Sequence, residues 1–338
     1  MDYLKKIIKS IKKKTIKIED LFYLNELLKT NLPLKSCLML LRNDTNKGLF
    51  DSLIEQLEKG FLIEEIINDY LPKEISKYML SLLKKLSFNE SLQLSLMFYQ
   101  KSKENLKRIE KSLSYPIILL FISLTALYLF DYYALDSIID LMRSFNTDVK
   151  SFSSFRVFIK ILIYLFYFAF IVISIIVLYF FNPKRINIFY LLICRYFKNG
   201  LIQMYFTNEF VDLLIISLRL GYKTKDALEI LKSLDNKPIV ALLAFHLEDK
   251  LLEGNSLKEA SNQRYFDGTL GKFINIASFS KNFIDIMNNY VELTNEKLIN
   301  KIKFFTKLLQ GFSYVVIGIV IIFIYQVLFL PMQAIIAL

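Results

Sequence analysis

The sequence has no tryptophan and very few of the side chains that most catalytic centres use. Its 338 residues include one histidine, His246, and two cysteines, Cys37 and Cys194. Two cysteines so far apart provide neither a disulfide framework nor a cluster of metal ligands, and one histidine excludes most hydrolytic centres. We therefore predict no catalytic residue, no cofactor and no bound metal, and we expect both cysteines to pack as small apolar side chains.

Charged residues are also missing from long stretches of the chain. The composition is 54% hydrophobic and 15% aromatic, and no Asp, Glu, Lys or Arg occurs in 161–181 or 308–330. A helix needs about 20 mostly apolar residues to cross a bilayer. These two stretches and a third, 113–133, are long enough, so we predict a polytopic membrane protein with three transmembrane helices.

Lysine and arginine give the chain a net charge of +11, and they gather beside the apolar stretches. They precede the first stretch, follow the second and precede the third. Because cytoplasmic flanks carry such an excess, we predict a cytoplasmic N-terminus, an external C-terminus and a location in the inner (cytoplasmic) membrane. We expect no direct binding of nucleic acid, since the basic residues accompany apolar stretches.

The first sixteen residues, MDYLKKIIKSIKKKTI, form a basic segment without an apolar run of signal-peptide length. Two interpretations remain open. The segment is either a short amphipathic helix on an anionic membrane surface or an unstructured basic tail.

The two polar parts of the chain resemble each other. Three pairs of segments recur in the same order, about 190 residues apart, and such self-similarity indicates an internal repeat. The pairs are SFNESL (87–92) with SFSKNF (278–283), NLPLKSCL (31–38) with GYKTKDAL (221–228), and the turns at Gly60 and Gly254. We therefore predict two homologous cytoplasmic domains.

Leucines at helical spacing, separated by proline and glycine, predict an all-α fold in which each repeat is a bundle of about six helices. The last helix of each bundle is long and leads into a transmembrane helix. The predicted boundaries are 1–16 for the basic segment, 17–112 for the first bundle, 113–133 and 157–181 for the first two transmembrane helices, 134–156 for a short external loop, 182–204 for a basic connector, 205–307 for the second bundle, 308–330 for the third transmembrane helix and 331–338 for an external tail.

This organisation resembles the type II secretion F domain family, over about residues 17–338. Tyr115-Pro116 matches the tyrosine–proline at the family's first span, and Leu330-Pro331-Met332 matches its C-terminal leucine–proline–methionine. NLPLKSCL follows the family's pattern with Asn31 in place of glycine, and Gly221 restores that glycine in the second repeat. The family's glycine–glutamate pair is missing, because Leu86-Ser87 and Ala277-Ser278 occupy those positions.

The resemblance implies a non-enzymatic membrane platform in type II secretion, type IV pili or competence pseudopili that take up DNA. The implied partners are a hexameric cytoplasmic secretion ATPase, pilin-like subunits, membrane lipid and further copies of the chain. The Lys-, Ile-, Asn- and Phe-rich composition favours the competence-type members of Gram-positive bacteria. Candidates for structural roles or partner contacts are Tyr115, Pro116, Pro331, Met332, Gly60, Gly221, Gly254, Glu65 and Glu259.

Pro116 stands where the charged run ends and the first apolar stretch begins. A proline inside a helix removes one hydrogen bond and costs about 3 kcal/mol there. Pro116 either starts a new helix or kinks a continuous one, with water or the Ser112 hydroxyl satisfying the freed carbonyl; we favour the kink. An incidental proline at an interface is the simpler alternative.

Two other classes of function fit the sequence less well than a platform does. A small-molecule transporter needs polar or ionisable residues along its spans, and these are nearly absent. A membrane-embedded enzyme needs a catalytic cluster at the membrane interface. The only acidic group predicted near the outer interface is Asp131, Asp136 and Asp140, and the membrane topology accounts for these acids without catalysis. The stretch FDGTLGKF (266–273) lacks the first glycine and the final Ser or Thr of a phosphate-binding loop.

Overall fold

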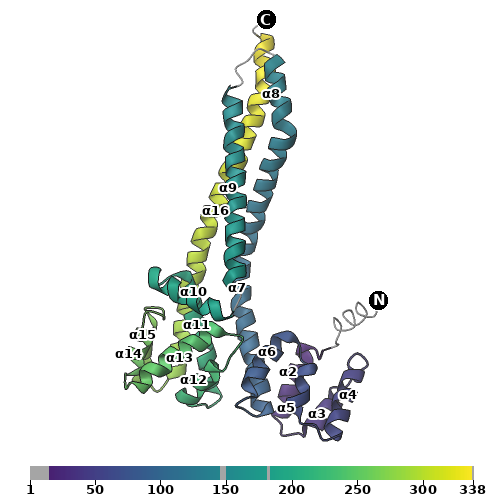
Figure 1. Cartoon of the computed structure of the whole chain (residues 1–338), viewed down its shortest axis with the longest axis vertical. Helices are drawn as coiled ribbons and strands as arrows, with labels where there is room; N and C mark the ends of the chain where they lie inside the picture. Colours follow the sequence, from purple (N-terminus) through teal and green to yellow (C-terminus); the bar gives the residue numbers. More distant parts are fainter. Residues whose placement is uncertain (1–14, 145–149, 181–182, 337–338) are drawn as a thin grey trace. The chain divides into compact units, whose positions relative to one another are not determined.

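The structure is a computed structural model that describes residues 15–144, 150–180 and 183–336 (Figure 1). All regular secondary structure in these ranges is helical, with fifteen α-helices, α2 to α16. The prediction of an all-α fold is therefore confirmed for this part of the chain. The residues form two compact units, one with residues up to Asn105 and Ile186–Asn295, the other with Leu106–Arg185 and residues from Glu296 onward.

The first unit contains most of the short helices. Its N-terminal part holds α2 (Ile18–Leu28), α3 (Leu34–Leu40), α4 (Lys47–Glu58), α5 (Ile63–Ile66), α6 (Lys73–Leu82) and the beginning of α7 (Phe88–Leu129). Its second part holds α10 (Pro183–Tyr196), α11 (Leu201–Arg219), α12 (Thr224–Lys232), α13 (Pro238–Leu252), α14 (Leu257–Ser261), α15 (Leu270–Ser278) and the beginning of α16 (Phe283–Ile336).

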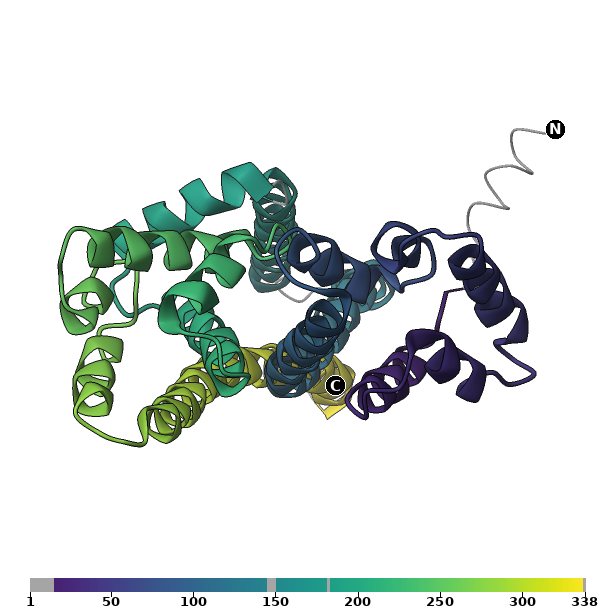
Figure 2. The same ribbon diagram turned by 90° about the horizontal axis from the view of Figure 1, so that it is seen from below.

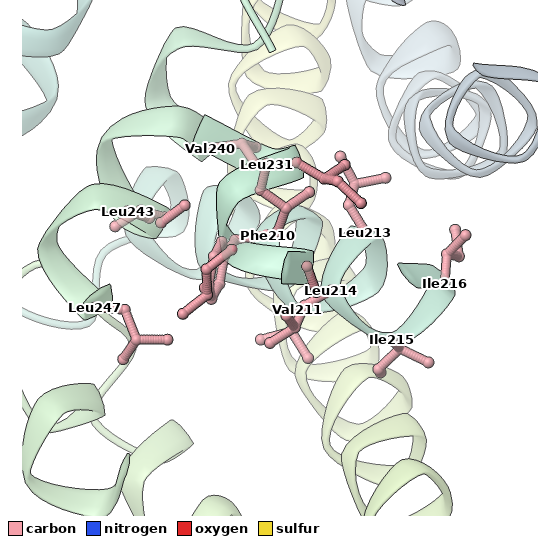
Figure 3. Close-up of a cluster of buried hydrophobic side chains, with 14 of the residues drawn as sticks. Phe210, Val211, Leu213, Leu214, Ile215, Ile216, Leu231, Val240, Leu243 and Leu247 are labelled. Atoms are coloured by element: carbon pink, nitrogen blue, oxygen red, sulfur yellow. The ribbon is translucent and has the colours of Figure 1, made fainter. Parts of the chain in front are cut away.

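Two hydrophobic clusters hold this unit together. One is built from α2 to α7, with Leu21, Phe50 and Leu53 fully buried. The other is built mainly from α10 to α16 and is centred on α11. Figure 3 shows side chains of α11 and α13 in this second cluster, including Phe210, Leu243 and Leu247. Helix α11 is buried on almost every side, with Glu209 and Asp212 among its buried residues, so it is surrounded by protein.

The first turns of α7 belong to both clusters. Leu92 and Leu96 are buried in the first cluster, whereas Leu94 and Phe98 are buried in the second. Residues two positions apart on a helix point to nearly opposite sides, so α7 separates the two cores and packs on both. Figure 2 shows the purple helices of the first cluster and the green helices of the second on either side of the blue helices α6 and α7.

The turns of the two parts follow the same order. Asn31, with φ of 60°, lies between α2 and α3, and Gly221, with φ of 90°, lies between α11 and α12. Gly60 and Gly254, with φ of 89° and 88°, lie in the same way between α4 and α5 and between α13 and α14. In all four cases the next helix begins three residues after the left-handed residue.

The second unit consists of long helices. It contains the rest of α7, a π-helical turn over Phe130–Ala134, α8 (Leu135–Ser144), α9 (Lys150–Phe180) and most of α16. Helices therefore occupy most of the range 134–156 that the sequence analysis assigned to a loop. Large apolar side chains of α7, α9 and α16 are exposed, among them Phe121, Phe168 and Phe312.

Three helices of the described residues are long and apolar enough to cross a membrane. Two of them, Phe88–Tyr133 and Phe283–Ile319, contain or overlap the first and third predicted spans. The other, Leu201–Arg219, is α11, and 72% of its apolar window is buried within the protein. The second predicted span lies in α9, where the described apolar stretch is Ile163–Val172, and residue 181 lies outside the described residues.

Candidate functional site

Two acidic residues are buried in the middle of α11. Glu209 is 2% exposed and Asp212 is 3% exposed. Their spacing of three places both carboxylates on the same side of the helix. A charged carboxylate so far from water is costly unless other groups pair with it and donate hydrogen bonds, and residues from two other places in the first unit do both.

Asp212 is bound by two residues of α7. The Lys101 ammonium lies 3.1 Å from Oδ1 of Asp212, and Nδ2 of Asn105 donates a 2.8 Å hydrogen bond to Oδ2. Lys101 and Asn105 are four positions apart, so one face of α7 provides both donors. The remaining Oδ1 atom of Asn105 is buried and has no hydrogen-bond partner.

Glu209 is bound from two directions. The Lys237 ammonium, just before α13, lies 2.5 Å from its Oε1 atom, and the Ser102 hydroxyl of α7 donates to the same atom at 3.2 Å. The Tyr78 hydroxyl of α6 in turn donates to Ser102 at 3.1 Å. We call this set the α7–α11 network: Tyr78, Lys101, Ser102, Asn105, Glu209, Asp212 and Lys237.

Burial dominates the electrostatics of the α7–α11 network. Loss of water raises the pKa of Asp212 above its ordinary value, against the opposing effect of Lys101. Burial alone would lower the pKa of Lys237, but the neighbouring Glu209 carboxylate outweighs it, so this pKa is raised. Tyr205 has a raised pKa because it is buried and lies near Glu209.

The α7–α11 network is suited to fixing one helix against another rather than to catalysis. Buried ion pairs add little net stability compared with apolar residues, whereas a single displaced partner leaves an unpaired charge. The network therefore favours one register of α7 on α11. Among the described residues, no group of three His, Cys, Asp or Glu is placed to hold a metal ion.

The predicted site residues are not gathered in one place, and three of them terminate helices. Gly60, Gly221 and Gly254 follow the C-terminal ends of α4, α11 and α13 and have positive φ. In each turn the glycine N–H and the next N–H donate to the helix's last carbonyls, as with Gly221 to Leu218 and Tyr222 to Ser217. This is the Schellman motif, which glycine adopts without strain.

The two predicted acidic residues have different surroundings. Glu259 forms a capping box with Ser256 at the start of α14: its Oε2 accepts from the Ser256 N–H at 2.9 Å, and the Glu259 N–H donates to the Ser256 hydroxyl. These hydrogen bonds lower the pKa of Glu259. Glu65 is exposed in the first turn of α5.

Tyr115 and Pro116 lie inside α7, which continues through both. Pro116 therefore does not start a new helix. The Ser112 hydroxyl donates to the carbonyl of Arg108 at 3.2 Å, so the expected bond from this hydroxyl to the freed carbonyl of its own residue is not formed. Tyr115 is exposed on α7, and its hydroxyl interacts with that of Tyr314 on α16. Pro331 and Met332 fall within α16.

The cysteines and the histidine occupy packed positions. Cys37 and Cys194 are both fully buried, which confirms the prediction that they pack as apolar side chains. Burial raises the pKa of both thiols. His246 stacks on Tyr265 with ring centroids 4.4 Å apart, and burial lowers its pKa.

Two of the acidic residues considered as an enzyme cluster are engaged by one arginine. Arg156 on α9 forms two hydrogen bonds with Asp136 on α8 and lies 3.4 Å from Asp131. Asp140 lies 3.5 Å from Arg143. In the stretch FDGTLGKF, the Asp267 carboxylate accepts hydrogen bonds from Thr269, and the backbone N–H of Asp267 donates to Thr207 within the second cluster. These groups are therefore used in structural pairs.

One part of the chain is similar to a known protein family. Residues 210–331 match type II secretion system (T2SS) protein F. The matched segment begins within α11, between the two buried acids, and extends along α16 to Pro331. A search of curated proteins found no match.

The resemblance inferred from the sequence is thereby supported over residues 210–331, which is part of the range 17–338 that was expected to carry it, and one T2SSF domain is found. Family members are inner-membrane platform proteins of type II secretion and type IV pilus systems, with structural rather than catalytic roles. The α7–α11 network was not predicted from the sequence. One signal for it was available, since two acids in the otherwise apolar segment TNEFVDLLIISL require buried partners.

Proposed function

We propose that this protein is a membrane platform that couples a hexameric cytoplasmic secretion ATPase to the assembly of pilin-like subunits. The observation that carries the proposal is the T2SSF match over residues 210–331. The exposed apolar faces of α7, α9 and α16 support it, because they suit contacts with lipid and with other membrane helices. The basic, Lys- and Ile-rich composition supports a competence-type filament system.

We also propose that residues 17–112 and 205–307 are two homologous cytoplasmic bundles. Three features support this repeat. The helices follow the same order, left-handed residues occur after α2, α4, α11 and α13, and the last helix of each part continues into an apolar segment. In the proposed topology the N-terminus is cytoplasmic and the C-terminus external.

In such a platform the α7–α11 network has a mechanical role. It attaches α7, which leads into the first apolar span, to the first helix of the second bundle. A load applied to either bundle is then shared with the other through paired charges. The T2SSF domain contains Asp212 and Lys237, while Lys101 and Asn105 lie on the N-terminal side of the first span.

The proposal is tested by purifying the tagged protein from native membranes and identifying its partners by mass spectrometry. Recovery of a secretion ATPase together with pilin-like subunits is the expected result, and the identity of the pilins names the filament. An equally tagged, unrelated polytopic protein from the same membranes is the control. Absence of both partners, from membranes that contain them, would contradict the proposal. Oligomeric state is read from the same preparation by cross-linking.

A further inference from the structure

Helix α10 has two different faces, and among the described residues only one of them is buried. Tyr190 and Cys194, four positions apart, are fully buried. Ile188, Leu192 and Tyr196, also spaced by four, are 58%, 44% and 75% exposed. At 100° per residue the two rows lie on opposite sides of the helix. The range 182–204, which the sequence analysis took for a basic connector, thus contains an amphipathic helix.

The buried face is held by specific contacts, which fix the direction of the exposed one. The Tyr190 hydroxyl donates a 2.6 Å hydrogen bond to the carbonyl of Tyr265, and its ring packs edge-on against Phe206. At the C-terminal end of α10, the Arg264 guanidinium donates to the carbonyls of Cys194 and Arg195. Helix α10 is therefore docked on the second cluster, and its apolar outer face is exposed although the helix is held in place.

The exposed face combines apolar and basic side chains. Arg195, Phe197 and Lys198 are exposed around its C-terminal end. At its N-terminal end the Arg185 guanidinium lies 4.5 Å from the ring centre of Tyr179, the last turn of α9. No acidic residue occurs between Pro183 and Gly200. Apolar residues flanked by Arg and Lys, without acids, are the pattern of helices that lie in the surface of an anionic bilayer.

The position of α10 in the chain brings it to such a surface. Only two residues separate the end of α9 at Phe180 from the start of α10 at Pro183. Helix α9 contains residues 157–180 of the second predicted span, so we expect its end to lie at the membrane boundary on the side where α10 begins. We propose that the exposed face of α10 binds the surface of an anionic phospholipid bilayer and anchors the second cluster to it, with Arg195 and Lys198 pairing with lipid phosphates.

This inference is tested with the full-length protein in lipid nanodiscs that contain phosphatidylglycerol and phosphatidylcholine. A spin label is attached at Leu192→Cys, and its collisions with oxygen, which concentrates in lipid, are compared with those of a water-soluble nickel chelate. The buried native thiols give the labelling background, measured on the unsubstituted chain. The matched control is Leu252→Cys, a second exposed leucine, which is the last residue of α13 and is 77% exposed.

We expect the label at position 192 to favour oxygen and the label at position 252 to favour the nickel chelate. Equal behaviour of the two labels overturns the proposal. Protection of position 192 from both reagents also overturns it, because protein rather than lipid would then cover the helix. These results do not depend on the ATPase or the pilins, so they are separate from the test of the platform function.

The basic residues are tested in the same nanodiscs. The double change Arg195→Glu with Lys198→Glu, or replacement of phosphatidylglycerol by phosphatidylcholine, should reduce the oxygen preference at position 192 several-fold. An unchanged preference in both cases would show that the helix does not recognise anionic lipid and would overturn that part of the proposal. Circular dichroism of the double variant verifies that its helical content is kept.

Discussion

The side-chain amide of Asn105 on α7 donates a 2.8 Å hydrogen bond to the carboxylate of Asp212 on α11, across 107 positions of the chain. Lys101 binds the other oxygen of the same carboxylate. The buried acid therefore has one neutral and one charged partner. The lysine side chain is 29% exposed, whereas the side chain of the acid is only 4% exposed. When the pair is broken, the lysine can therefore reach water and the acid cannot.

Removing the lysine should therefore lower the free energy of unfolding more than neutralising the acid does. We expect Lys101→Met to lower the free energy of unfolding by about 3 kcal/mol, because it leaves a buried carboxylate without its counter-charge. Asp212→Asn should change it by less than about 1 kcal/mol, since Lys101 then turns to solvent and Asn105 keeps an acceptor. Thermal unfolding in detergent, followed by circular dichroism, measures both. Lys107→Met, an exposed lysine on the same helix, is the control; equal losses from Lys101→Met and Asp212→Asn would contradict this account.

The same acid predicts a pH dependence. Burial raises the pKa of folded Asp212 above its ordinary 3.8. A carboxyl with a raised pKa binds protons more tightly in the folded protein, so its stabilising contribution is complete below the unfolded pKa and is lost as pH rises through the folded pKa. The thermal midpoint of the natural protein, relative to Asp212→Asn, should thus fall as the pH is raised from about 4 to about 8. A constant difference would show that Asp212 has no raised pKa.

Replacing glycine by alanine should have opposite effects on stability at two kinds of position. Gly254→Ala should destabilise the protein by about 1 to 2 kcal/mol, because φ of 88° is strained for a residue with a Cβ atom. Gly48→Ala should stabilise it by about 0.5 to 1 kcal/mol, since Gly48 is exposed within α4 and nothing lies within 4 Å of an added Cβ. Thermal unfolding of the two variants gives the signs directly. A loss of stability in both variants would mean that the volume of the added side chain, rather than the backbone conformation, determines the change in stability.

Two roles of Glu259, capping helix α14 and contacting a partner protein, can be distinguished by substitution. As a cap it accepts from the Ser256 N–H, which the neutral side chain of Glu259→Gln can also do, whereas Glu259→Ala cannot. We expect Glu259→Ala and Ser256→Ala to lower the thermal midpoint by similar amounts, with Glu259→Gln close to the natural protein. If Glu259→Gln keeps its thermal midpoint but loses the secretion ATPase in the purification, the charge is a partner contact. Glu65→Gln, at the corresponding exposed position of α5, is compared in the same assay.

Pro116→Ala should leave membrane insertion intact and reduce filament assembly. The substitution restores the N–H that proline lacks, so it should remove the kink that we predict in α7 where the apolar stretch begins. Filaments are counted by electron microscopy, and membrane levels of the protein by immunoblot. Ile118→Ala, two residues further along the helix, is the control. Normal assembly with Pro116→Ala would show that the angle at this position has no role.

The fragment 17–112 should fold as a helical bundle but should not remain monomeric. It retains the first cluster apart from Ile16, including Leu21, Phe50 and Leu53. It exposes Leu94 and Phe98, which the intact protein buries against the second cluster. We expect a helical circular-dichroism spectrum with self-association in sedimentation, relieved by co-expression with residues 186–295. A disordered spectrum would contradict the proposed domain boundary.

Much of the local structure could be predicted from the sequence. The punctuation by Gly60, Gly221 and Gly254 correctly marked the ends of helices, because a left-handed turn after a helix favours glycine regardless of tertiary packing. The apolar stretches at 113–133 and 308–330 were equally visible. Ser256 and Glu259 form a signature of a helix start that is also readable from spacing alone, although the sequence analysis did not use it.

The α7–α11 network could not be located in the same way. Glu209 and Asp212 are visible as acids in an apolar helix, but their partners lie 107 positions earlier in α7 or just before α13. Their pairing depends on how the two hydrophobic clusters share α7, which no local pattern encodes. Helix α10 was missed for a different reason: its outer row of Ile188, Leu192 and Tyr196 and its buried row of Tyr190 and Cys194 have the same spacing and are both largely apolar, so the sequence does not show which row faces the protein.

The hydrogen bonds from Arg264 to the last carbonyls of α10 have a consequence for biosynthesis. Arg264 follows Cys194 by 70 positions, so the ribosome releases α10 before the residue that closes its C-terminal end. Protein synthesis adds about 5 to 20 residues per second, so several seconds pass before Arg264 can bind those carbonyls. Tyr190 waits still longer for Tyr265, 75 positions away. Docking of α10 is thus a late step of translation, completed only after α11, α12 and α13 have been made.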